Sequence, residues 1–479
     1  MKKVREFICM IALMLTDIAS LLSSFLIAYL LRSRLLTPII PRFKYQEPLP
    51  LSVQFNLVVI YGALIIILVF LYEKLYTKRL PFWEDTKHLL RAVTVSFILM
   101  TVLVFVSRQY IFFSRAVVVL TWVLSLAIFP LFRLSMKRIL AKVGLWSKKV
   151  IILGTKDMAR FVAQEIKRNH LLGYQVLGFL TEDTSKTGKK TAGIEILGGL
   201  NEVEKWSRQL GVRDVIIALP EFSQNELINI IENCEGFAET IRIVPSIGSL
   251  FTLGVVVENM GDVSTLSVTR NLVKPFNILV KTGFEFIFAT IVSLLLLPVF
   301  LIVALAIKID SRGPIIFVQE RLGKRSKRFK FYKFRSMYVD ADLRLERFLK
   351  DNPRARKEWE KYQKIKVNDP RVTRVGKVIR RYSLDELPQL FNFFKRNMNL
   401  VGPRPYMPRE IEKIGTRDQI ITRVKPGITG LWQVRGRNIL PFYERLLLDE
   451  YYIRNWSLWM DIVILLKTID VFITQEGAF

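Results

Sequence analysis

Histidine and cysteine are scarce in this chain of 479 residues. The two histidines, His88 and His170, argue against a histidine-dependent catalytic triad and against a metal site built from several histidines. The two cysteines, Cys9 and Cys234, lie far apart, and Cys9 falls inside an apolar run. We therefore expect no structural disulfide and a reducing environment.

Acidic residues are also few compared with basic ones. The chain has 71 Lys and Arg against 42 Asp and Glu, a formal net charge of +29. Such a charge attracts nucleic acid, anionic lipid headgroups or phosphate-bearing substrates. Half of the residues are apolar and the mean hydropathy is positive, which indicates membrane segments. The length allows two or three domains.

Four long apolar runs come first and predict a four-helix transmembrane domain over residues 1–144. They cover roughly residues 7–31, 55–72, 89–106 and 116–132. The first run is too long for a signal peptide and lacks a cleavage site, so we expect an uncleaved span. Asp17 lies inside this run, where a packing hydrogen bond between helices is favoured over a lipid-carrier site.

Flanking charge predicts the orientation of these spans, because loops rich in Lys and Arg stay in the cytoplasm. The segment after the fourth run has six basic residues and no acid: Arg133, Lys137, Arg138, Lys142, Lys148 and Lys149. With four spans, the N-terminus is then cytoplasmic as well. The basic residues of the loop at 32–50 would then lie outside the cell, which argues against this orientation.

Residues 145–270 predict a Rossmann-like α/β domain. Strands fit 148–153, 175–180, 215–219 and 240–244, with a helix after Gly154, and this alternation is typical of a parallel sheet. The turn GTKDMA (154–159) has one glycine where a dinucleotide fingerprint needs three. A structural, regulatory or dimerisation role is therefore favoured over NAD binding.

A fifth apolar run covers residues 286–307 and contains Pro298 near its middle. A full crossing would put the strongly basic stretch 321–335 outside the cell, against the usual charge rule. We therefore predict a re-entrant helix–break–helix over residues 271–310, with Lys281 and Glu285 at the membrane interface. A kinked full span is the alternative.

Residues 311–479 predict a mostly α-helical catalytic domain whose distinctive feature is a carboxylate pair among basic residues. Ser383-Leu-Asp-Glu fits a capping box, which would place Asp385 and Glu386 in the first turn of a helix. Pro388 favours a helix that begins one turn later. Adjacent side chains point in different directions, so one carboxylate could attack a phosphorus while the other holds a divalent cation. A simple helix cap is the alternative.

Basic residues on stiff turns surround this pair and suit a pyrophosphate. They are Arg380, Arg381, Arg404 in GPRP, Lys333 and Arg335 in KFRS, and Arg435 and Arg437 after PGITG. Mg²⁺ fits as cofactor, because it takes few carboxylates together with substrate phosphate oxygens.

Four stretches resemble the bacterial sugar transferase family, the monotopic polyprenyl-phosphate phosphoglycosyl transferases. They are GPIIFVQERLGKRSKRFKFYKFRSM (313–337), NDPRVTRVGKVIRRYSLDELPQLFN (368–392), VGPRP (401–405) and KPGITGLWQVRGRN (425–438). The whole chain resembles the large four-span members, the undecaprenyl-phosphate galactose or glucose phosphotransferases. Asn397 departs from the acid usual in the family before VGPRP, a change that concerns loop packing and substrate contacts and not the carboxylate pair.

The resemblance implies a two-step reaction at the bacterial inner membrane, with the catalytic domain on the cytoplasmic face. Asp385 would attack a UDP-sugar and release UMP, and undecaprenyl phosphate would then accept the phosphosugar, the first membrane step of surface polysaccharide synthesis. Glu386 would bind Mg²⁺, and Pro298 would break the re-entrant helix. We expect phosphate contacts from Arg380, Arg404, Lys333, Arg335 and Arg437, and donor contacts from Gln433 and Arg381. Anionic lipids and a second copy of the chain, as a homodimer, are the other expected partners.

Two other functions would share some of these sequence features. A membrane-anchored NAD-dependent nucleotide-sugar dehydratase or epimerase could share the front half, but it needs a full glycine fingerprint and a Tyr-x-x-x-Lys base, and neither follows residue 270. A nucleic-acid-binding protein would explain the charge, but the basic residues cluster beside apolar segments, which favours lipid. Trp456 and Trp459 are expected at the membrane interface, where they flank 458–473, a stretch that predicts an interfacial or packing helix.

Overall fold

The computed structural model describes residues 2–39, 61–106, 114–219, 224–244, 255–260, 263–268, 271–353, 355–356, 359, 365, 369–436 and 440–474. The chain forms two compact units, Met1–Ser246 and Ile247–Phe479. The predicted boundary at residue 270 therefore falls inside the second unit.

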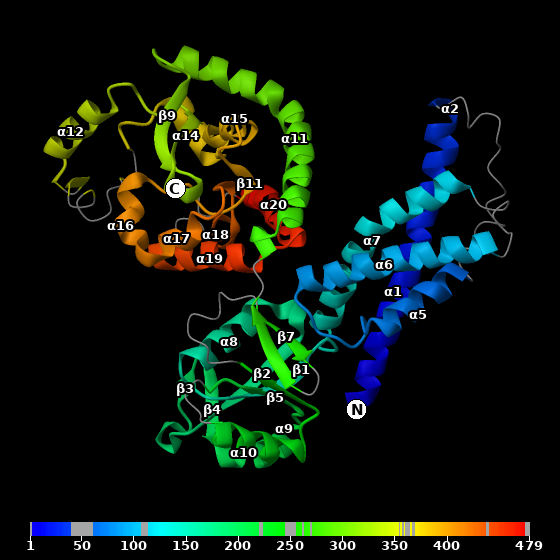
Figure 1. Ribbon diagram of the computed structural model, residues 1–479. Helices are drawn as coiled ribbons and strands as arrows, with labels where there is room; N and C mark the ends of the chain where they lie inside the picture. The colour runs from blue at the N-terminus through cyan, green and yellow to red at the C-terminus, as the bar shows by residue number, and fades with distance from the viewer. Residues whose placement is uncertain are drawn as a thin grey trace. The chain divides into compact units, whose positions relative to one another are not determined.

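Apolar helices make up the first part of the N-terminal unit (Figure 1). They are α1 (Lys2–Leu30), the π-helical η1 (Leu31–Leu36), α2 (Thr37–Ile39), α5 (Ala63–Tyr72), α6 (Phe82–Val106) and α7 (Arg115–Lys142). Val4–Ile39, Phe82–Val106 and Arg115–Lys142 are long and apolar enough to cross a membrane. Residues 55–60 of the predicted second span lie outside the described residues, so the count of four spans stays a prediction.

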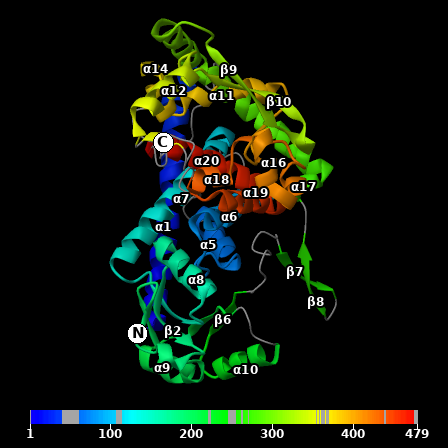
Figure 2. The same cartoon turned by 90° about the vertical axis from the view of Figure 1, so that its left-hand side faces the viewer.

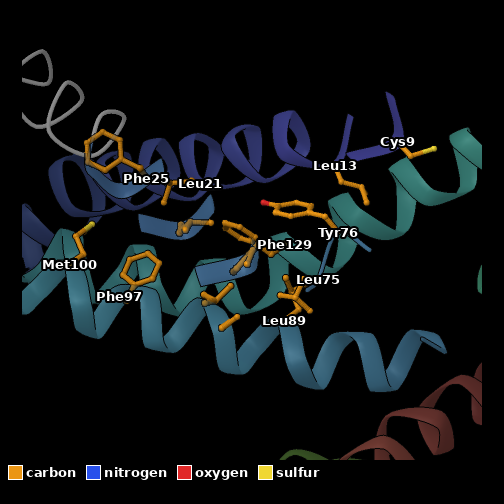
Figure 3. Packing of buried hydrophobic residues seen from close by; sticks show 14 of the residues in the cluster. Cys9, Leu13, Leu21, Phe25, Leu75, Tyr76, Leu89, Phe97, Met100 and Phe129 are labelled. Atoms are coloured by element: carbon orange, nitrogen blue, oxygen red, sulfur yellow. The ribbon is translucent and has the colours of Figure 1, made fainter. Parts of the chain in front are cut away.

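The helices meet in an apolar core that encloses two ion pairs. Figure 3 shows Leu13 and Phe25 of α1 on the same core as Phe97 of α6 and Phe129 of α7. The side chains of the two ion pairs, Asp17–Arg133 and Asp85–Lys137, are all buried. Asp17 accepts two hydrogen bonds from Arg133, at 2.8 and 2.7 Å, and Lys137 donates to Asp85 at 2.7 Å.

These ion pairs decide two sequence predictions. The packing role of Asp17 is confirmed, because its carboxylate joins α1 to α7 and satisfies a guanidinium that would otherwise be buried alone. Arg133 and Lys137 were counted as cytoplasmic flanking charges, and this was wrong, because both are neutralised inside the bundle. The orientation prediction now depends on Arg138, Lys142 and Lys149, since Lys148 pairs with the buried Asp214 at 2.8 Å.

A six-stranded sheet follows in the same unit, with strand order β3-β4-β2-β1-β5-β6. Its strands are β1 (Lys148–Leu153), β2 (Tyr174–Thr181), β3 (Lys190–Thr191), β4 (Ile194–Gly199), β5 (Asp214–Ile217) and β6 (Thr240–Ile243), and the helices are α8 (Asp157–Arg168), α9 (Val203–Leu210) and α10 (Gln224–Glu235). All neighbours pair in parallel except β3 with β4. The four predicted strands and the parallel sheet are confirmed.

Strand β1 is buried on both faces, as a central parallel strand requires. Val150 and Ile152 pack with residues of α8, whereas Ile151 and Leu153 pack with residues of α9 and α10. Gly154 follows β1 with φ of +112°, and a Cβ there would lie 2.5 Å from the carbonyl oxygen of Ala218. Packing within the domain is therefore sufficient to require this glycine, without a bound phosphate. Cys9 and Cys234 are free and buried, which confirms the expected lack of a disulfide between them.

The C-terminal unit begins with a hairpin and a long helix. The hairpin strands are β7 (Val255–Met260) and β8 (Val263–Val268), followed by η8 (Asn271–Val273) and α11 (Pro275–Asp310). Helix α11 is also long and apolar enough to cross a membrane. It stays helical through Pro298, so the predicted break does not interrupt it; instead the helix bends (Figure 1). Re-entry itself stays a prediction.

Short elements complete this unit and pack against one another. They are β9 (Ile316–Leu322), η9 (Lys324–Ser326), β10 (Arg328–Phe334), α12 (Ala341–Asp351), α14 (Arg374–Arg381), η10 (Leu384–Glu386), α15 (Gln389–Phe394), β11 (Asn399–Val401), η11 (Pro408–Glu410), α16 (Ile411–Ile414), η12 (Gly415–Arg417), α17 (Asp418–Ile421), β12 (Gly427–Thr429), α18 (Leu431–Arg435), α19 (Phe442–Asn455) and α20 (Leu458–Thr474). Strands β9 and β10 form an antiparallel hairpin, and β11 pairs in parallel with β12. Helix α19 packs against α17 and α18 (Figures 1 and 2).

Candidate active site

The carboxylate pair lies in a tight turn between two helices. Helix α14 ends at Arg381, Ser383 adopts a left-handed conformation with φ of 50°, and Leu384–Glu386 forms a single 3₁₀ turn. The side chain of Ser383 makes no capping hydrogen bond, so the predicted capping box is wrong. Helix α15 begins after Pro388, one turn later, as the proline led us to expect.

Asp385 is almost fully buried and faces a lysine. The Nζ atom of Lys333, on β10, lies 3.6 Å from Asp385 Oδ2 and donates to Glu386 Oε1 at 2.7 Å. Burial raises the pKa of Asp385, the charge of Glu386 raises it further, and Lys333 opposes both. The carboxylate is thus more basic than a surface aspartate and remains close to a positive charge. Both properties suit a nucleophile that attacks a phosphorus.

Arg380 stands on the last turn of α14, before the carboxylate pair. Its Nε donates to Ser336 Oγ at 2.8 Å. Burial lowers the pKa of Arg380, while the charge of Asp385 raises it. The structure therefore brings Asp385, Glu386, Lys333 and Arg380 together. Arg381 is exposed at the end of the same helix.

Arg335 closes a turn. It is buried and donates to the carbonyl oxygens of Arg312 and Ser311 at 2.9 and 2.7 Å, and to Ser311 Oγ at 2.8 Å. These bonds fix the chain where it leaves α11. The turn borders a surface hollow of about 580 Å³, lined by residues 310–312 and 338–340, that does not include Asp385 or Glu386. Phosphate binding by Arg335 stays a prediction that the contacts of this side chain do not favour.

The VGPRP segment is held by close backbone packing. Gly402 N donates to Thr429 O, and Gly427 N donates to Pro403 O. A Cβ on Gly402 would lie 2.7 Å from Gly427 N, and one on Gly427 would lie closer still to Gly402 N, so both positions need glycine. This close contact between the backbones around Gly402 and Gly427 fixes the segment from which Arg404 projects.

Asp449 holds the same segment from α19. Its Oδ2 accepts hydrogen bonds from Arg404 N at 3.2 Å and from the Tyr406 hydroxyl at 2.8 Å. Burial raises the pKa of Asp449 to about 7, although both hydrogen bonds and the charge of Arg404 lower it. The charge of this carboxylate therefore changes close to neutral pH.

A buried polar network ties α11 to the start of the VGPRP segment. Lys281 Nζ donates to Glu285 and Asp461, each at 2.7 Å, to Val401 O at 3.0 Å and to the Tyr452 hydroxyl at 3.1 Å. Val401 N donates to Glu285 at 3.0 Å. Lys281 and Glu285 were expected at the membrane interface, and this was wrong, because a fully paired lysine is stable inside a core.

The predicted interfacial position of Trp456 is also wrong. Its side chain is buried and its indole nitrogen donates to Asp461 at 2.9 Å. The predicted helix over 458–473 is present as α20.

Two further predictions concern the segment after PGITG. Gln433 donates to Ile428 O at 3.1 Å, and its Oε1 is buried without a partner among the described residues. Arg437 lies outside the described residues.

Sequence reasoning missed Arg321, which lies on β9. Its guanidinium is buried, donates to Pro405 O at 3.1 Å and experiences the charges of both Arg404 and Glu386. Arg321 stands in the strongly basic stretch 321–335, where nothing distinguishes one cation from the next. Only the pairing of β9 with β10 and the contact with Pro405 single it out.

Glu386 has the chemistry of a Mg²⁺ ligand of the kind that shares its cation with a substrate. Its side chain is about one-third exposed, with Lys333 on Oε1. No cluster of three or more Asp, Glu, His or Cys side chains is found among the described residues. One carboxylate plus substrate phosphate oxygens and water is a usual Mg²⁺ environment, so the residues present fit this ion.

Comparison with known proteins identifies the family of this chain. The family model described as bacterial sugar transferase matches residues 276–475, and one described as CoA-binding domain matches residues 56–245. The chain is 36% identical over 412 residues to the UDP-galactose-lipid carrier transferase of Erwinia amylovora, with 84% of each chain covered. It is 35% identical to the undecaprenyl-phosphate galactose phosphotransferase of Salmonella typhimurium, again over 84% of each.

A relative that is named for glucose matches a shorter part of this chain. The undecaprenyl-phosphate glucose phosphotransferase of Komagataeibacter xylinus is 33% identical over 70% of this chain and 60% of its own length. Apolar helices in both units agree with a membrane protein. Since the first two relatives exceed 30% identity over most of both chains, this protein belongs to the bacterial sugar transferase family and is a transferase.

Proposed function

We propose that this enzyme transfers a hexose 1-phosphate from a UDP-sugar to undecaprenyl phosphate through a phosphosugar covalently bound to Asp385. The observation that carries the proposal is the buried Asp385 carboxylate with Lys333 3.6 Å away and Arg380 close enough to act on its charge. The named activities of the relatives supply the substrate class. They do not favour a nucleotide-sugar dehydratase.

In the first step a carboxylate oxygen of Asp385 attacks the β-phosphorus of the donor. The bond between that phosphorus and the bridging oxygen breaks, and UMP leaves with the electron pair. Lys333 and Arg380 offset the negative charge on the phosphoryl oxygens. Mg²⁺ bound at Glu386 would neutralise further phosphate charge.

In the second step an oxygen of undecaprenyl phosphate attacks the same phosphorus. The bond to Asp385 breaks, the carboxylate is regenerated, and undecaprenyl-diphospho-hexose forms. Galactose or glucose is the proposed hexose, after the relatives' names. We place the reaction on the cytoplasmic face of the inner membrane, as the first membrane step of a surface polysaccharide, in a homodimer.

The test is release of UMP from a panel of UDP-sugars by the purified full-length enzyme with undecaprenyl phosphate and Mg²⁺. Wild type should release UMP from one hexose donor, whereas Asp385→Asn should release none, because an amide is a poor nucleophile. Asp342→Asn, an exposed aspartate on α12, is the matched control and should behave as wild type. Equal rates for Asp385→Asn and wild type would remove Asp385 from the reaction.

A further inference from the structure

Three arginines form a second cationic group beside the carboxylate pair. Arg321 projects from β9, Arg404 from the VGPRP segment and Arg445 from α19. The guanidinium carbons of Arg404 and Arg445 lie 5.4 and 5.3 Å from the centre of the Trp432 ring. Arg321 is joined to the segment through its bond to Pro405 O. We call Arg321, Arg404 and Arg445 the arginine cluster.

The cluster carries positive charge that the protein compensates only in part. Burial and the charge of Arg404 lower the pKa of Arg321 to about 10, although Glu410 and Glu386 oppose this. Burial and Arg404 also lower the pKa of Arg445. Among the described residues, no carboxylate oxygen lies within 4 Å of the guanidinium of Arg321 or Arg404.

Two hydrogen-bond donors in or next to the arginine cluster also lack an acceptor within the described residues. Nε of Arg321 and the indole nitrogen of Trp432 are both buried and have no partner within the described part of the chain. A buried guanidinium without a carboxylate, and a buried donor without an acceptor, each cost free energy. A bound anion with several acceptor oxygens would satisfy them together.

The stereochemistry of the proposed reaction indicates which anions would bind at the arginine cluster. In-line displacement at phosphorus puts the attacking and the leaving oxygen on opposite sides. Asp385 attacks in the first step and leaves in the second, so UMP must depart from the side opposite Asp385 and the acceptor phosphate must enter from that same side. Both are phosphate monoesters with nearly two negative charges at neutral pH.

We propose that Arg321, Arg404 and Arg445 form one phosphate-monoester subsite, used first by the departing nucleotide and then by the acceptor lipid. The inference rests on the proposed two-step function. Arg321 connects the cluster to the carboxylate pair, because its guanidinium carbon and Lys333 Nζ lie 5.4 and 5.7 Å from the centre of the same Phe331 ring, and Lys333 donates to Glu386. Because the two phosphates take turns in one subsite, each should exclude the other.

Two half-reactions of the full-length enzyme test this. The first is exchange of isotope-labelled UMP into the UDP-sugar that releases UMP with wild type, without acceptor. The second is transfer from the isolated phosphosugar–enzyme to undecaprenyl phosphate. Arg321→Met should raise the half-saturating concentration of UMP in the first and of undecaprenyl phosphate in the second, each by about tenfold or more, the usual effect of a charge-assisted hydrogen bond.

Matched variants separate this effect from misfolding. Arg321→Lys should restore part of both affinities, and Arg445→Met should raise both concentrations as Arg321→Met does. Arg328→Met, an exposed arginine on the same hairpin that pairs with Glu320, should change neither. In wild type, UMP should inhibit the transfer half-reaction in competition with undecaprenyl phosphate.

The outcomes are distinct. A change in only one of the two concentrations would show separate subsites, and no change in either would place the phosphate elsewhere; both overturn the inference and leave the covalent mechanism intact. Absence of UMP exchange in wild type would instead overturn the proposed function, and the inference with it.

Discussion

The proposed reactivity of Asp385 depends on its neighbours more than on its place in the sequence. An aspartate at a helix start is usually an exposed cap, whereas this one is buried, beside Glu386 and opposite Lys333. Burial and Glu386 raise its pKa, whereas the positive charge of Lys333 lowers it and so favours the ionised carboxylate.

Lys333→Met should therefore shift the pH dependence of UMP release. The active form of Asp385 is the carboxylate, which is lost as pH falls through its raised pKa. Without Lys333 that pKa rises further, so the acid limb of the rate profile should move to higher pH, and the rate at the optimum should fall on the order of a hundredfold. An acid limb that stays in place would show that Lys333 does not act on Asp385. Lys395→Met, an exposed lysine bonded to the Tyr332 hydroxyl, is the control.

Asp449 predicts a second, separate pH effect. Its pKa of about 7 means that below neutral pH it protonates and becomes a weaker acceptor for Arg404 N and the Tyr406 hydroxyl. The KM for the donor should rise as pH falls through about 7. Asp449→Asn should show the raised KM throughout, with no step near pH 7. A step that persists in the variant would assign it to another group.

Single residues show where sequence reasoning stops. Asp385, Glu386, Lys333 and Arg380 were predicted together, and the structure brings them together. Arg335 was placed with them, yet it bonds to the turn after α11, because β10 ends at Phe334 and Arg335 no longer follows the side-chain alternation that places Lys333. Arg321 was missed because its contact with Pro405 joins residues 84 positions apart, which no local pattern reports.

At the scale of elements, periodicity and proline were the reliable signals. The four predicted strands of the sheet are present, and Pro388 placed the start of α15 correctly. Strand β4 was missed, since Ile194–Gly199 ends in two glycines and alternates poorly. Pro298 does not end α11, because one lost hydrogen bond costs less than ending a long apolar helix.

The polar network under the VGPRP segment couples three elements and predicts a stability effect. Tyr452→Phe removes the hydroxyl that contacts Lys281, Asp461 and Val401, and it leaves buried polar atoms short of a partner. The free energy of unfolding should fall by about 1–3 kcal/mol. Thermal unfolding of the detergent-solubilised enzyme measures this.

The matched control for this network is Tyr443→Phe. The Tyr443 side chain is more than half exposed, and among the described residues its hydroxyl bonds only to the half-buried Arg417 at an exposed position, so its loss should change the stability little. Equal losses in the two variants would show that the network adds nothing beyond an ordinary surface hydrogen bond.

At the scale of the whole molecule, charge and hydropathy indicated the class of protein correctly, and the family comparison agrees. They were less informative about detail, because Arg133, Lys137, Lys281 and Glu285 are charged residues that lie inside the fold. Counting such residues as flanking charges assumes that every charged side chain faces water. A charged side chain can instead be buried when a partner of opposite charge pairs with it.

Helix α11 gives the topology its clearest test. Phe276 and Ile309 are exposed near its two ends, and Cys9 and Cys234 are buried. If the helix re-enters, Phe276→Cys and Ile309→Cys should both react with a membrane-impermeant maleimide from the cytoplasmic side only. Labelling of the two positions from opposite sides would establish a full crossing.

The covalent intermediate is the central claim, and one measurement tests it most directly. Purified enzyme is incubated with its UDP-sugar and Mg²⁺ but without undecaprenyl phosphate, and peptides covering residues 382–395 are analysed by mass spectrometry. The account predicts a hexose-phosphate adduct on Asp385 that disappears when undecaprenyl phosphate is added. An enzyme that turns over with acceptor present but never carries this adduct would contradict it.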